Sequence, residues 1–327
     1  MSGKTAAVRF QAAGTSPARP LQTKDFLSVL DLSHDELRRL LDLSASLKRD
    51  RAMGRLDARP LAGRHVALLF EKPSLRTRST FSIAVRELGG DVLEPPADVA
   101  FGGRETVEDV ARNLERWVAG VVVRTFAQAR LERFAAAAPR LRVINALTNE
   151  EHPCQALADF LTLGEHAGEL AGRTLAFVGD GNNVAASLAH AGAMLGVNLR
   201  VASPKGFELP QAVIEAAHRA ARHGAAVTVT NDPHEAVRGA DAVYTDVWAS
   251  MGQESEAEAR DRVFRPFQVN AALMASAGPQ ALFMHCLPAH REAEVTDEVI
   301  DSPVSVVFDQ AENRLHTQKA LIALLMG

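Results

Sequence analysis

The feature that most constrains the fold of this chain is a regular alternation of strand-like and helix-like segments. Candidate strands lie at 64–70, 91–94, 120–125 and 142–147. Apolar residues recur at helical spacing between them, at 76–88, 105–118 and 128–138. Strands that alternate with helices are typical of a parallel sheet covered by helices. We therefore predict an α/β fold.

A second series of strands follows the first, and a helical pattern from Pro153 to Glu165 joins the two. The predicted strands of this series lie at 175–179, 198–202, 226–230, 241–246, 281–287 and 304–308. With 327 residues, the chain exceeds the length at which a single core usually stops growing. We expect two domains, each a mainly parallel sheet flanked by helices, at 25–150 and 151–310.

Residues 1–24 are expected to form a disordered tail. The segment is rich in Ala, Gly, Ser and Pro and has no acidic residue before Asp25, which is also a property of organellar transit peptides. Structure is predicted to begin near Phe26. The run from Ser33 to Glu36 is a capping box that should open a helix.

Composition restricts the classes of partner. A formal net charge of −4 argues against nucleic acid or an anionic membrane surface as a partner, because either needs a basic surplus. No apolar run approaches the roughly 20 residues that a membrane helix needs. The two cysteines, Cys154 and Cys286, cannot form a disulfide framework and suit a reducing compartment. We expect a cytoplasmic enzyme that acts on small molecules.

Polar residues gather where the predicted strands end. Ligands of parallel α/β sheets bind outside the carboxyl ends of the strands, so the six clusters found there are candidate site segments. They are Ser74–Arg78, Arg124–Thr125, His152–Gln155, Gly179–Asn183, Asp246–Gly252 and His285–Pro288.

The turn from Ser74 to Arg78 is predicted to bind an anion. It joins an apolar strand to a helix, so free backbone N–H groups and the positive end of a helix dipole meet the cations Lys72, Arg76 and Arg78. The alternative is that Ser74 is a plain N-cap and that the arginines lie on a solvated helix face. The interpretation as an anion site therefore depends on partners elsewhere in the chain.

Such partners exist in the first half of the chain, and they include no carboxylate. The set is Ser74, Arg76, Thr77, Arg78, Arg124, His152 and Gln155. Guanidinium groups bind phosphate through paired hydrogen bonds, and a histidine can donate to a neighbouring carbonyl oxygen. The alternative for His152 alone is a residue that merely begins a helix.

The candidates in the second half have the opposite character. Asp246 can bind an ammonium group, Asn183 and Ser250 can bind a carboxylate, and Cys286 lies beside the apolar Leu287. This set suits an amino acid. The alternatives are a strand-end turn residue for Asp246 and a small buried apolar residue for Cys286. Together, the two sets indicate transfer of an acyl-like group.

Neither a metal nor a cofactor is expected. His152-x-Cys154 and His285-Cys286 lack the paired spacing of a zinc site. The segment from Gly179 to Val184 lacks the third glycine of the dinucleotide fingerprint, and the next strand offers no acid for a ribose.

The motifs together resemble the aspartate/ornithine carbamoyltransferase family over nearly the whole chain from about residue 25. The segments that carry the resemblance are Phe70–Arg78, His152–Gln155, Phe177–Asn183, Asp246–Gly252, His285–Pro288 and Ala311–His316. The resemblance implies transfer of the carbamoyl group from carbamoyl phosphate to the side-chain amine of ornithine.

The resemblance also implies roles for individual residues. The expected carbamoyl phosphate site consists of Ser74, Leu75, Arg76, Thr77, Arg124, His152, Gln155, Cys286, Leu287 and Arg314. The expected ornithine site consists of Asn183, Asp246, Ser250 and Met251, and the catalytic residues are expected to be Arg76, Arg124, His152 and Cys286. It further implies a homotrimer in which the C-terminal helix, 311–327, returns to the first domain.

Two positions depart from the family pattern. Leu75 stands where many members carry threonine, which matters little if this residue contributes only its backbone N–H. Ala100 aligns with a loop that in many members supplies a glutamine to the phosphate site of a neighbouring subunit, and alanine cannot make that contact. Arg104 is a candidate replacement.

Other acceptors and other classes of function stay open at this point. Aspartate, putrescine and N-acetylornithine are competing acceptors, although Asp246 favours an amine that keeps its free α-ammonium group. Outside the family, the alternatives are a nucleotide-dependent dehydrogenase and a non-catalytic phosphate-binding protein.

Overall fold

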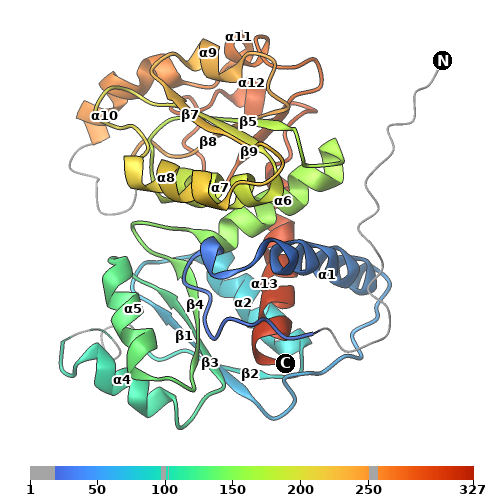
Figure 1. Cartoon of the computed structure of the whole chain (residues 1–327), viewed down its shortest axis with the longest axis vertical. Helices are drawn as coiled ribbons and strands as arrows, with labels where there is room; N and C mark the ends of the chain where they lie inside the picture. The colour runs from blue at the N-terminus through green and yellow to red at the C-terminus, as the bar shows by residue number, and fades with distance from the viewer. Residues whose placement is uncertain (1–18, 97–100, 102, 250–256) are drawn as a thin grey trace. The chain divides into compact units, whose positions relative to one another are not determined.

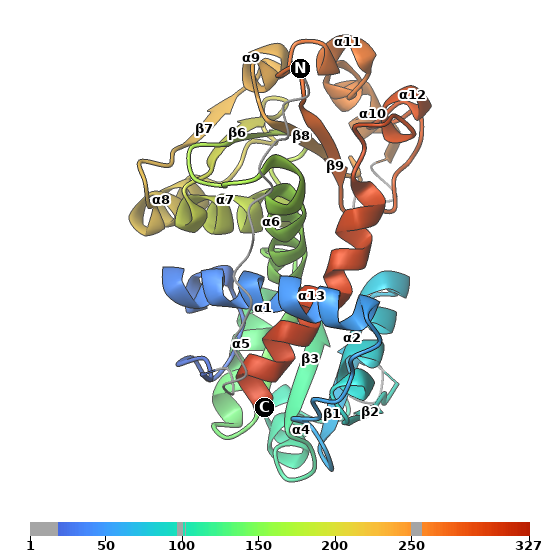
Figure 2. The same ribbon diagram turned by 90° about the vertical axis from the view of Figure 1, so that its right-hand side faces the viewer.

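The computed structural model describes residues 19–96, 101, 103–249 and 257–327, which form two compact units. One unit contains the described residues up to Ala158 together with Glu312–Gly327, and the other contains Asp159–Ala311. The chain passes between the units within two helices, α6 (Pro153–Ala167) and α13 (Val307–Met326). Figure 1 and Figure 2 show the elements of each unit.

The first unit has a four-stranded parallel sheet in the order β2-β1-β3-β4. The strands are β1 (His65–Phe70), β2 (Asp91–Leu93), β3 (Gly120–Arg124) and β4 (Arg142–Leu147). The helices are η1 (Val29–Asp31), α1 (His34–Ala52), α2 (Leu75–Glu87), α4 (Val107–Leu114) and α5 (Gln128–Ala137). The four strands predicted from the first half of the sequence are confirmed.

Side chains that alternate along the central strands form the core of this unit. Ala67 and Leu69 on β1 and Val121 and Val123 on β3 pack against apolar residues of α4 and α5, such as Phe134. Because successive strand residues point to opposite faces, the remaining apolar residues of these strands face away from α4 and α5. Both faces of the sheet are therefore apolar, as expected for a parallel sheet covered on both sides.

The helix α1 begins at the predicted capping box. The Ser33 side chain accepts a hydrogen bond from the backbone N–H of Glu36, and the Glu36 carboxylate accepts one from the N–H of Ser33 (3.0 Å). Two donors at the helix start are satisfied in this way. The predicted helix start is confirmed.

The C-terminal helix α13 returns to the first unit, as the resemblance implied. Its Asn313 accepts a hydrogen bond from Lys48 on α1 (2.9 Å), and its buried Lys319 forms an ion pair with the half-buried Glu87 on α2 (2.8 Å). Near its end, the Leu324 carbonyl accepts from the N–H of Leu21 (3.0 Å). These contacts fix α13 against the helices that precede and follow β1.

The second unit has a five-stranded parallel sheet in the order β7-β6-β5-β8-β9. The strands are β5 (Thr174–Val178), β6 (Asn198–Ala202), β7 (Val227–Thr230), β8 (Ala242–Thr245) and β9 (Leu282–His285). The helices are α7 (Asn183–Leu195), α8 (Gln211–Ala220), α9 (Pro233–Val237), α10 (Ala257–Phe264), η3 (Arg265–Phe267), α11 (Ala271–Met274) and α12 (Asp297–Ile300).

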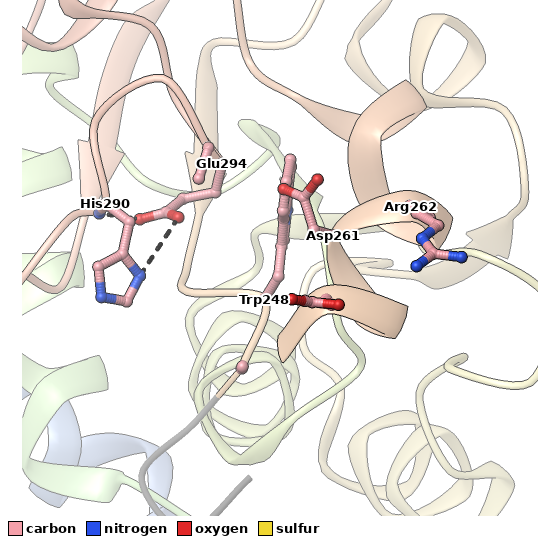
Figure 3. A pocket seen from close by; sticks show the side chains of 8 residues that line it. Trp248, Asp261, Arg262, His290 and Glu294 are labelled. Carbon is pink, nitrogen blue, oxygen red and sulfur yellow. Dashed lines mark hydrogen bonds and ion pairs between the residues drawn. The ribbon is translucent and has the colours of Figure 1, made fainter. Parts of the chain in front are cut away.

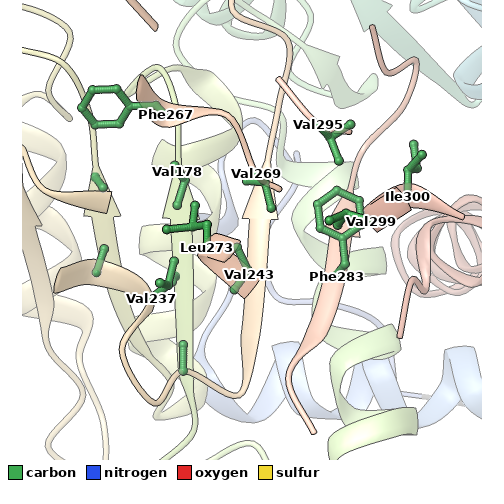
Figure 4. Close-up of a cluster of buried hydrophobic side chains, with 14 of the residues drawn as sticks. Val178, Val237, Val243, Phe267, Val269, Leu273, Phe283, Val295, Val299 and Ile300 are labelled. Atoms are coloured by element: carbon green, nitrogen blue, oxygen red, sulfur yellow. The ribbon is translucent and has the colours of Figure 1, made fainter. Parts of the chain in front are cut away.

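Helices cover both faces of this sheet. Val178, Val243 and Phe283 on the strands pack against α9, α11 and α12 in one buried cluster, for example against Leu273 and Val299 (Figure 4). The helices α7 and α8 lie on the other face (Figure 1). The order of the strands brings the carboxyl ends of β5, β8 and β9 next to one another, which positions the residues that follow them.

The prediction of a sixth strand at 304–308 is wrong. Ser305 makes only an isolated bridge with Phe283, and α13 begins at Val307. The apolar run thus spans the end of a loop and the first turn of α13, in which Val306 and Val307 are buried and Phe308 is exposed. The predicted strand 281–287 is also shorter than expected and ends at His285.

None of the helices in the described part of the chain is both long enough and apolar enough to cross a membrane.

Candidate active site

The predicted anion-binding turn is the start of α2. Ser74 is the N-cap residue, and its hydroxyl accepts a hydrogen bond from the N–H of Thr77 (3.3 Å). The first N–H groups of a helix have no acceptor within the helix and lie at the positive end of its dipole. The Leu75 side chain is 78% exposed, so this residue can offer an anion in the turn only its backbone N–H.

A buried arginine connects this turn to two other helices. Arg314 on α13 donates from Nη2 to the hydroxyl oxygen of Thr77 (2.6 Å) and from Nη1 to the amide oxygen of Gln155 on α6. All three side chains are almost completely buried. Residues from α2, α6 and α13 are thus brought together at the start of α2.

Arg124 is the last residue of β3 and His152 follows the neighbouring strand β4, and both side chains are buried. The pKa of His152 lies well below its ordinary value because the ring is buried and because Arg314 and Arg124 disfavour a further positive charge. The imidazole is therefore neutral near pH 7. A neutral imidazole N–H can donate to a carbonyl oxygen without carrying a charge of its own.

Two cations expected around the turn have partners of their own. Arg78 forms an ion pair with Glu94 (3.5 Å) and lies over the ring of Phe70. Lys72 donates to the amide oxygen of Asn149 (2.8 Å), and burial together with the charge of Arg124 lowers its pKa. The structure thus gives Arg78 a carboxylate partner that the sequence did not indicate.

The second candidate set centres on Asp246, just after β8. One carboxylate oxygen accepts hydrogen bonds from the Cys286 thiol (3.0 Å) and from the N–H of Val247 (2.8 Å), and the other accepts from the Asn182 side chain (2.7 Å). Asp246 and Cys286 were predicted independently from different strand ends. The pairing of β8 with β9 brings them together.

The segment that carries Cys286 is held by a buried histidine. Nδ1 of His285 accepts a hydrogen bond from the N–H of Leu287 (2.8 Å), and its Nε2 lies 3.3 Å from the carboxylate of Glu294. Leu287 has a φ of +56°, a left-handed conformation that is unfavourable for leucine. The hydrogen bond to His285 supports this turn beside the thiol.

The sequence patterns assign no individual role to Asn182, His285 or Glu294. The first two lie within the candidate segments at 179–183 and 285–288, and only Glu294 was missed altogether. Asn182 is the N-cap of α7 as well as a donor to Asp246, whereas the predicted Asn183 is half-buried in the first turn of that helix. The pair Asn182-Asn183 marked the right place, but spacing could not choose between two adjacent amides. Glu294 lies nine positions beyond His285 in the sequence, and no local pattern linked the two.

Several predicted residues cannot be placed. Ser250 and Met251 lie outside the described residues, as does Ala100. Arg104 is described and exposed.

One group of candidate metal ligands occurs among the described residues. The ligand atoms of Asp246, His285 and Cys286 lie within 4.8 Å of one another. Two of these side chains already bond to each other, and Nδ1 of His285 accepts from the backbone. These three residues come from two separate segments, 246 and 285–286, which the pairing of β8 with β9 brings together.

A pocket of about 530 Å³ lies in the second unit (Figure 3). It is lined by Trp248, Ala249, Glu258, Asp261, Arg262, His290, Ala293 and Glu294. Trp248 and Ala249 belong to the candidate segment at 246–252, but no described residue to which the sequence analysis gave an individual role lines the pocket. Glu294 also faces His285.

Comparison with known proteins agrees with this geometry. Two family models match: the carbamoyl phosphate-binding domain of aspartate/ornithine carbamoyltransferases at residues 24–165, and the aspartate/ornithine-binding domain at residues 171–325. The chain belongs to the aspartate/ornithine carbamoyltransferase family. The boundary between the two models falls within or just after α6.

Family members of high similarity carry one name. The chain is 51% identical to an ornithine carbamoyltransferase of Parafrankia sp. over 94% of its length and 97% of the relative. It is 51% identical to an ornithine carbamoyltransferase of Parasynechococcus marenigrum, with 97% of this chain and 98% of the relative covered.

Solved structures of the family have the same fold. The ornithine carbamoyltransferase of Pyrococcus furiosus matches with a TM-score of 0.89 and 48% identity over 93% of this chain and 97% of that one. The enzyme of Gloeobacter violaceus matches with a TM-score of 0.84 and 46% identity, over 93% and 99%. The expected α/β architecture is confirmed.

Proposed function

We propose that this protein transfers the carbamoyl group of carbamoyl phosphate to the side-chain amine of L-ornithine and releases L-citrulline and phosphate. The observation that carries the proposal is the buried cluster of Thr77, Gln155 and Arg314 beside Arg124 and His152. It offers several donors, and none of these five side chains is a carboxylate. Membership of the family and relatives named ornithine carbamoyltransferase support the acceptor.

The phosphate of the donor substrate is assigned to the start of α2. Ser74, Leu75, Arg76 and Thr77 would surround it with N–H groups, hydroxyls and one guanidinium, and Arg314 would add its charge from α13. Charge-assisted hydrogen bonds contribute about 1.5 to 3 kcal/mol each, so a few of them hold a small dianion.

The carbonyl oxygen of the donor is assigned to Arg124, His152 and Thr77, and Gln155 completes the site. Negative charge grows on this oxygen when the amine attacks, and preorganised donors stabilise it. The neutral state of His152 is compatible with this role, because a neutral imidazole keeps one N–H that can donate to the oxygen while Arg124 supplies the positive charge. Arg76, Arg124 and His152 are the catalytic residues of this half.

The acceptor amino acid is assigned to the second unit. Asp246 would bind the α-ammonium group of ornithine, with Asn183, Ser250 and Met251 holding the rest of the amino acid. Cys286 and Leu287 would line the reaction centre, and Cys286 is the fourth catalytic residue. The contact between the Cys286 thiol and Asp246 supports this placement, because it sets a carboxylate next to an apolar strand end.

The reaction requires the free base of the acceptor amine. An alkyl amine of pKa about 10.4 is mostly protonated at pH 7, and deprotonating it costs roughly 4 to 5 kcal/mol. We propose that the new C–N bond forms as the C–O bond to phosphate breaks. The departing phosphate then takes the proton that the amine nitrogen loses.

Domain limits, assembly and location are part of the proposal. We assign carbamoyl phosphate binding to 25–150 with the C-terminal helix 311–327, and ornithine binding to 151–310. We propose a homotrimer. We further propose that Arg104 replaces the contact with the neighbouring subunit's phosphate site that Ala100 cannot make. Sedimentation of the wild-type protein and of Arg104→Ala tests the trimer and the contribution of Arg104 to it. The two free cysteines suit a reducing compartment such as the cytoplasm.

A colorimetric citrulline assay with ornithine, putrescine and N-acetylornithine side by side tests the proposed function. Activity on ornithine alone supports it. Activity on another amine corrects the acceptor, and binding of phosphate without carbamoyl transfer to any amine contradicts it.

A further inference from the structure

The backbone N–H of His285, the last residue of β9, donates its outer hydrogen bond to a side chain instead of to a neighbouring strand. Of the strands in its sheet, β9 pairs only with β8. On its other edge, the N–H of Phe283 donates to the Val304 carbonyl (2.9 Å), and the Phe283 carbonyl accepts from the N–H of Val306 (3.0 Å). The N–H of His285 points to the same edge, where the side-chain oxygen of Gln310 accepts it (2.9 Å).

The amide of Gln310 has a fixed orientation. Its NH₂ group donates to one carboxylate oxygen of Asp159 on α6 (2.8 Å), and the Tyr244 hydroxyl donates to the other (3.2 Å). All three side chains are at most 1% exposed. Burial holds the pKa of Tyr244 well above its ordinary value, so the phenol remains a donor. The oxygen of Gln310 is therefore left to face the N–H of His285.

This buried network includes residues of both β8 and β9, the strands that precede Asp246 and Cys286. Tyr244 lies on β8 two residues before Asp246, and His285 directly precedes Cys286. The register of β8 and β9 pairs Thr245 with His285. Asp159 therefore bonds to Tyr244, two residues before Asp246, and Gln310 bonds to the backbone of His285, one residue before Cys286.

We infer that Asp159 and Gln310 are positioning residues for the Asp246–Cys286 pair. They act on the pair through Tyr244 and His285, with which they form hydrogen bonds. The role rests on the proposed function of that pair in ornithine transfer. Displacing a reacting group by about 1 Å can cost on the order of a hundredfold in rate, so positioning of this kind is measurable.

The substitution Gln310→Glu tests the network. It places a carboxylate against Asp159, and the two acids can keep their contact only by sharing a proton. We expect kcat to fall on the order of tenfold to a hundredfold. The KM for carbamoyl phosphate should stay within about twofold. Activity should fall further as the pH rises, because the shared proton is then lost.

The double variant Asp159→Asn with Gln310→Glu is the matched rescue. The new asparagine donates to the new glutamate and accepts from Tyr244, and the glutamate accepts from the N–H of His285. Each hydrogen bond of the network is thereby restored with the amide and the carboxylate exchanged. We expect most of the lost kcat to return and the added pH dependence to disappear.

A second readout does not depend on turnover. Alkylation by iodoacetamide reports on Cys286, since Cys154 is fully buried and burial raises its pKa to about 12. In Gln310→Glu and in Gln310→Met, we expect the contact between the Cys286 thiol and Asp246 to be loosened. The rate of alkylation of Cys286 should then rise by about threefold or more. The double variant should react at the wild-type rate.

Asp241→Asn is the control for loss of stability alone. Asp241 accepts from Arg173 and from the N–H of Thr174 at the opposite end of β8. Its substitution should lower Tm without changing kcat or the alkylation rate. If the Gln310 variants behave in the same way, the inference is overturned. Absence of citrulline with wild-type protein would contradict the proposed function, while the alkylation rates would still test the positioning role.

Discussion

Arg314 donates a hydrogen bond to the hydroxyl of Thr77 at 2.6 Å, although 237 positions separate the two residues in the chain. The contact exists because α13 packs against α1 and α2, where Lys48 and Glu87 hold it. The last helix thereby completes a site that begins after the first strand.

Replacing Arg314 by lysine should weaken carbamoyl phosphate binding. One ammonium group cannot reproduce the two-armed contact with Thr77 and Gln155, and a buried hydrogen-bonding group is left unsatisfied. We expect the KM for carbamoyl phosphate to rise about tenfold or more. Steady-state kinetics measure this. Lys48→Met, which affects α13 without touching the cluster, should leave KM near the wild-type value; an equal effect of both variants would contradict the assignment.

Arg76 and Arg78 should differ sharply in their effects. Arg76→Ala should lower kcat by two orders of magnitude or more, since it removes a charge at the proposed phosphate position. Arg78→Ala should change kcat less than about threefold, because Arg78 pairs with Glu94 and its charge is already matched. Near-normal turnover of the Arg76 variant would refute its catalytic role.

His152 should make the protein less stable in mild acid. Its pKa is lowered on folding, so the unfolded chain binds a proton at pH values where the folded protein does not. The stabilisation that neutral His152 gives to the folded protein is complete above about pH 6.5, the pKa in the unfolded chain. It is lost as the pH falls from that value to the lower pKa of the folded state. Denaturant unfolding at pH 7 and pH 5 measures the loss, which His152→Gln should reduce. An equal loss in both proteins would show that another group titrates.

Asp246→Asn should act on the acceptor alone. An amide cannot neutralise an ammonium group, so we expect the KM for ornithine to rise at least about tenfold while the KM for carbamoyl phosphate changes little. Steady-state kinetics with each substrate varied in turn separate the two effects. Asn182→Ala, which removes one donor to Asp246, should show a smaller effect of the same kind. A rise in the KM for carbamoyl phosphate of similar size would place Asp246 elsewhere in the reaction.

Much of the architecture could be predicted because its signals are local. The strands β1, β3 and β4 of the first unit are mainly apolar runs of strand length, and the start of α1 is marked by the capping box from Ser33 to Glu36. The failure at 304–308 has a physical cause. A short apolar run fits a strand and a buried helix start equally well, and packing around Phe283 decided between them.

The sequence by itself determined which chemical groups are available and at which strand ends they lie, because both depend on residue type and local periodicity. Only the tertiary structure decided which groups meet. In the folded protein, Arg314 donates a hydrogen bond to Thr77, and Arg78 forms an ion pair with Glu94. Asn182 and Cys286 both donate hydrogen bonds to Asp246. These choices follow from helix docking and strand order, which arise from burial of apolar surface across the whole chain and leave no trace in the spacing of any single motif.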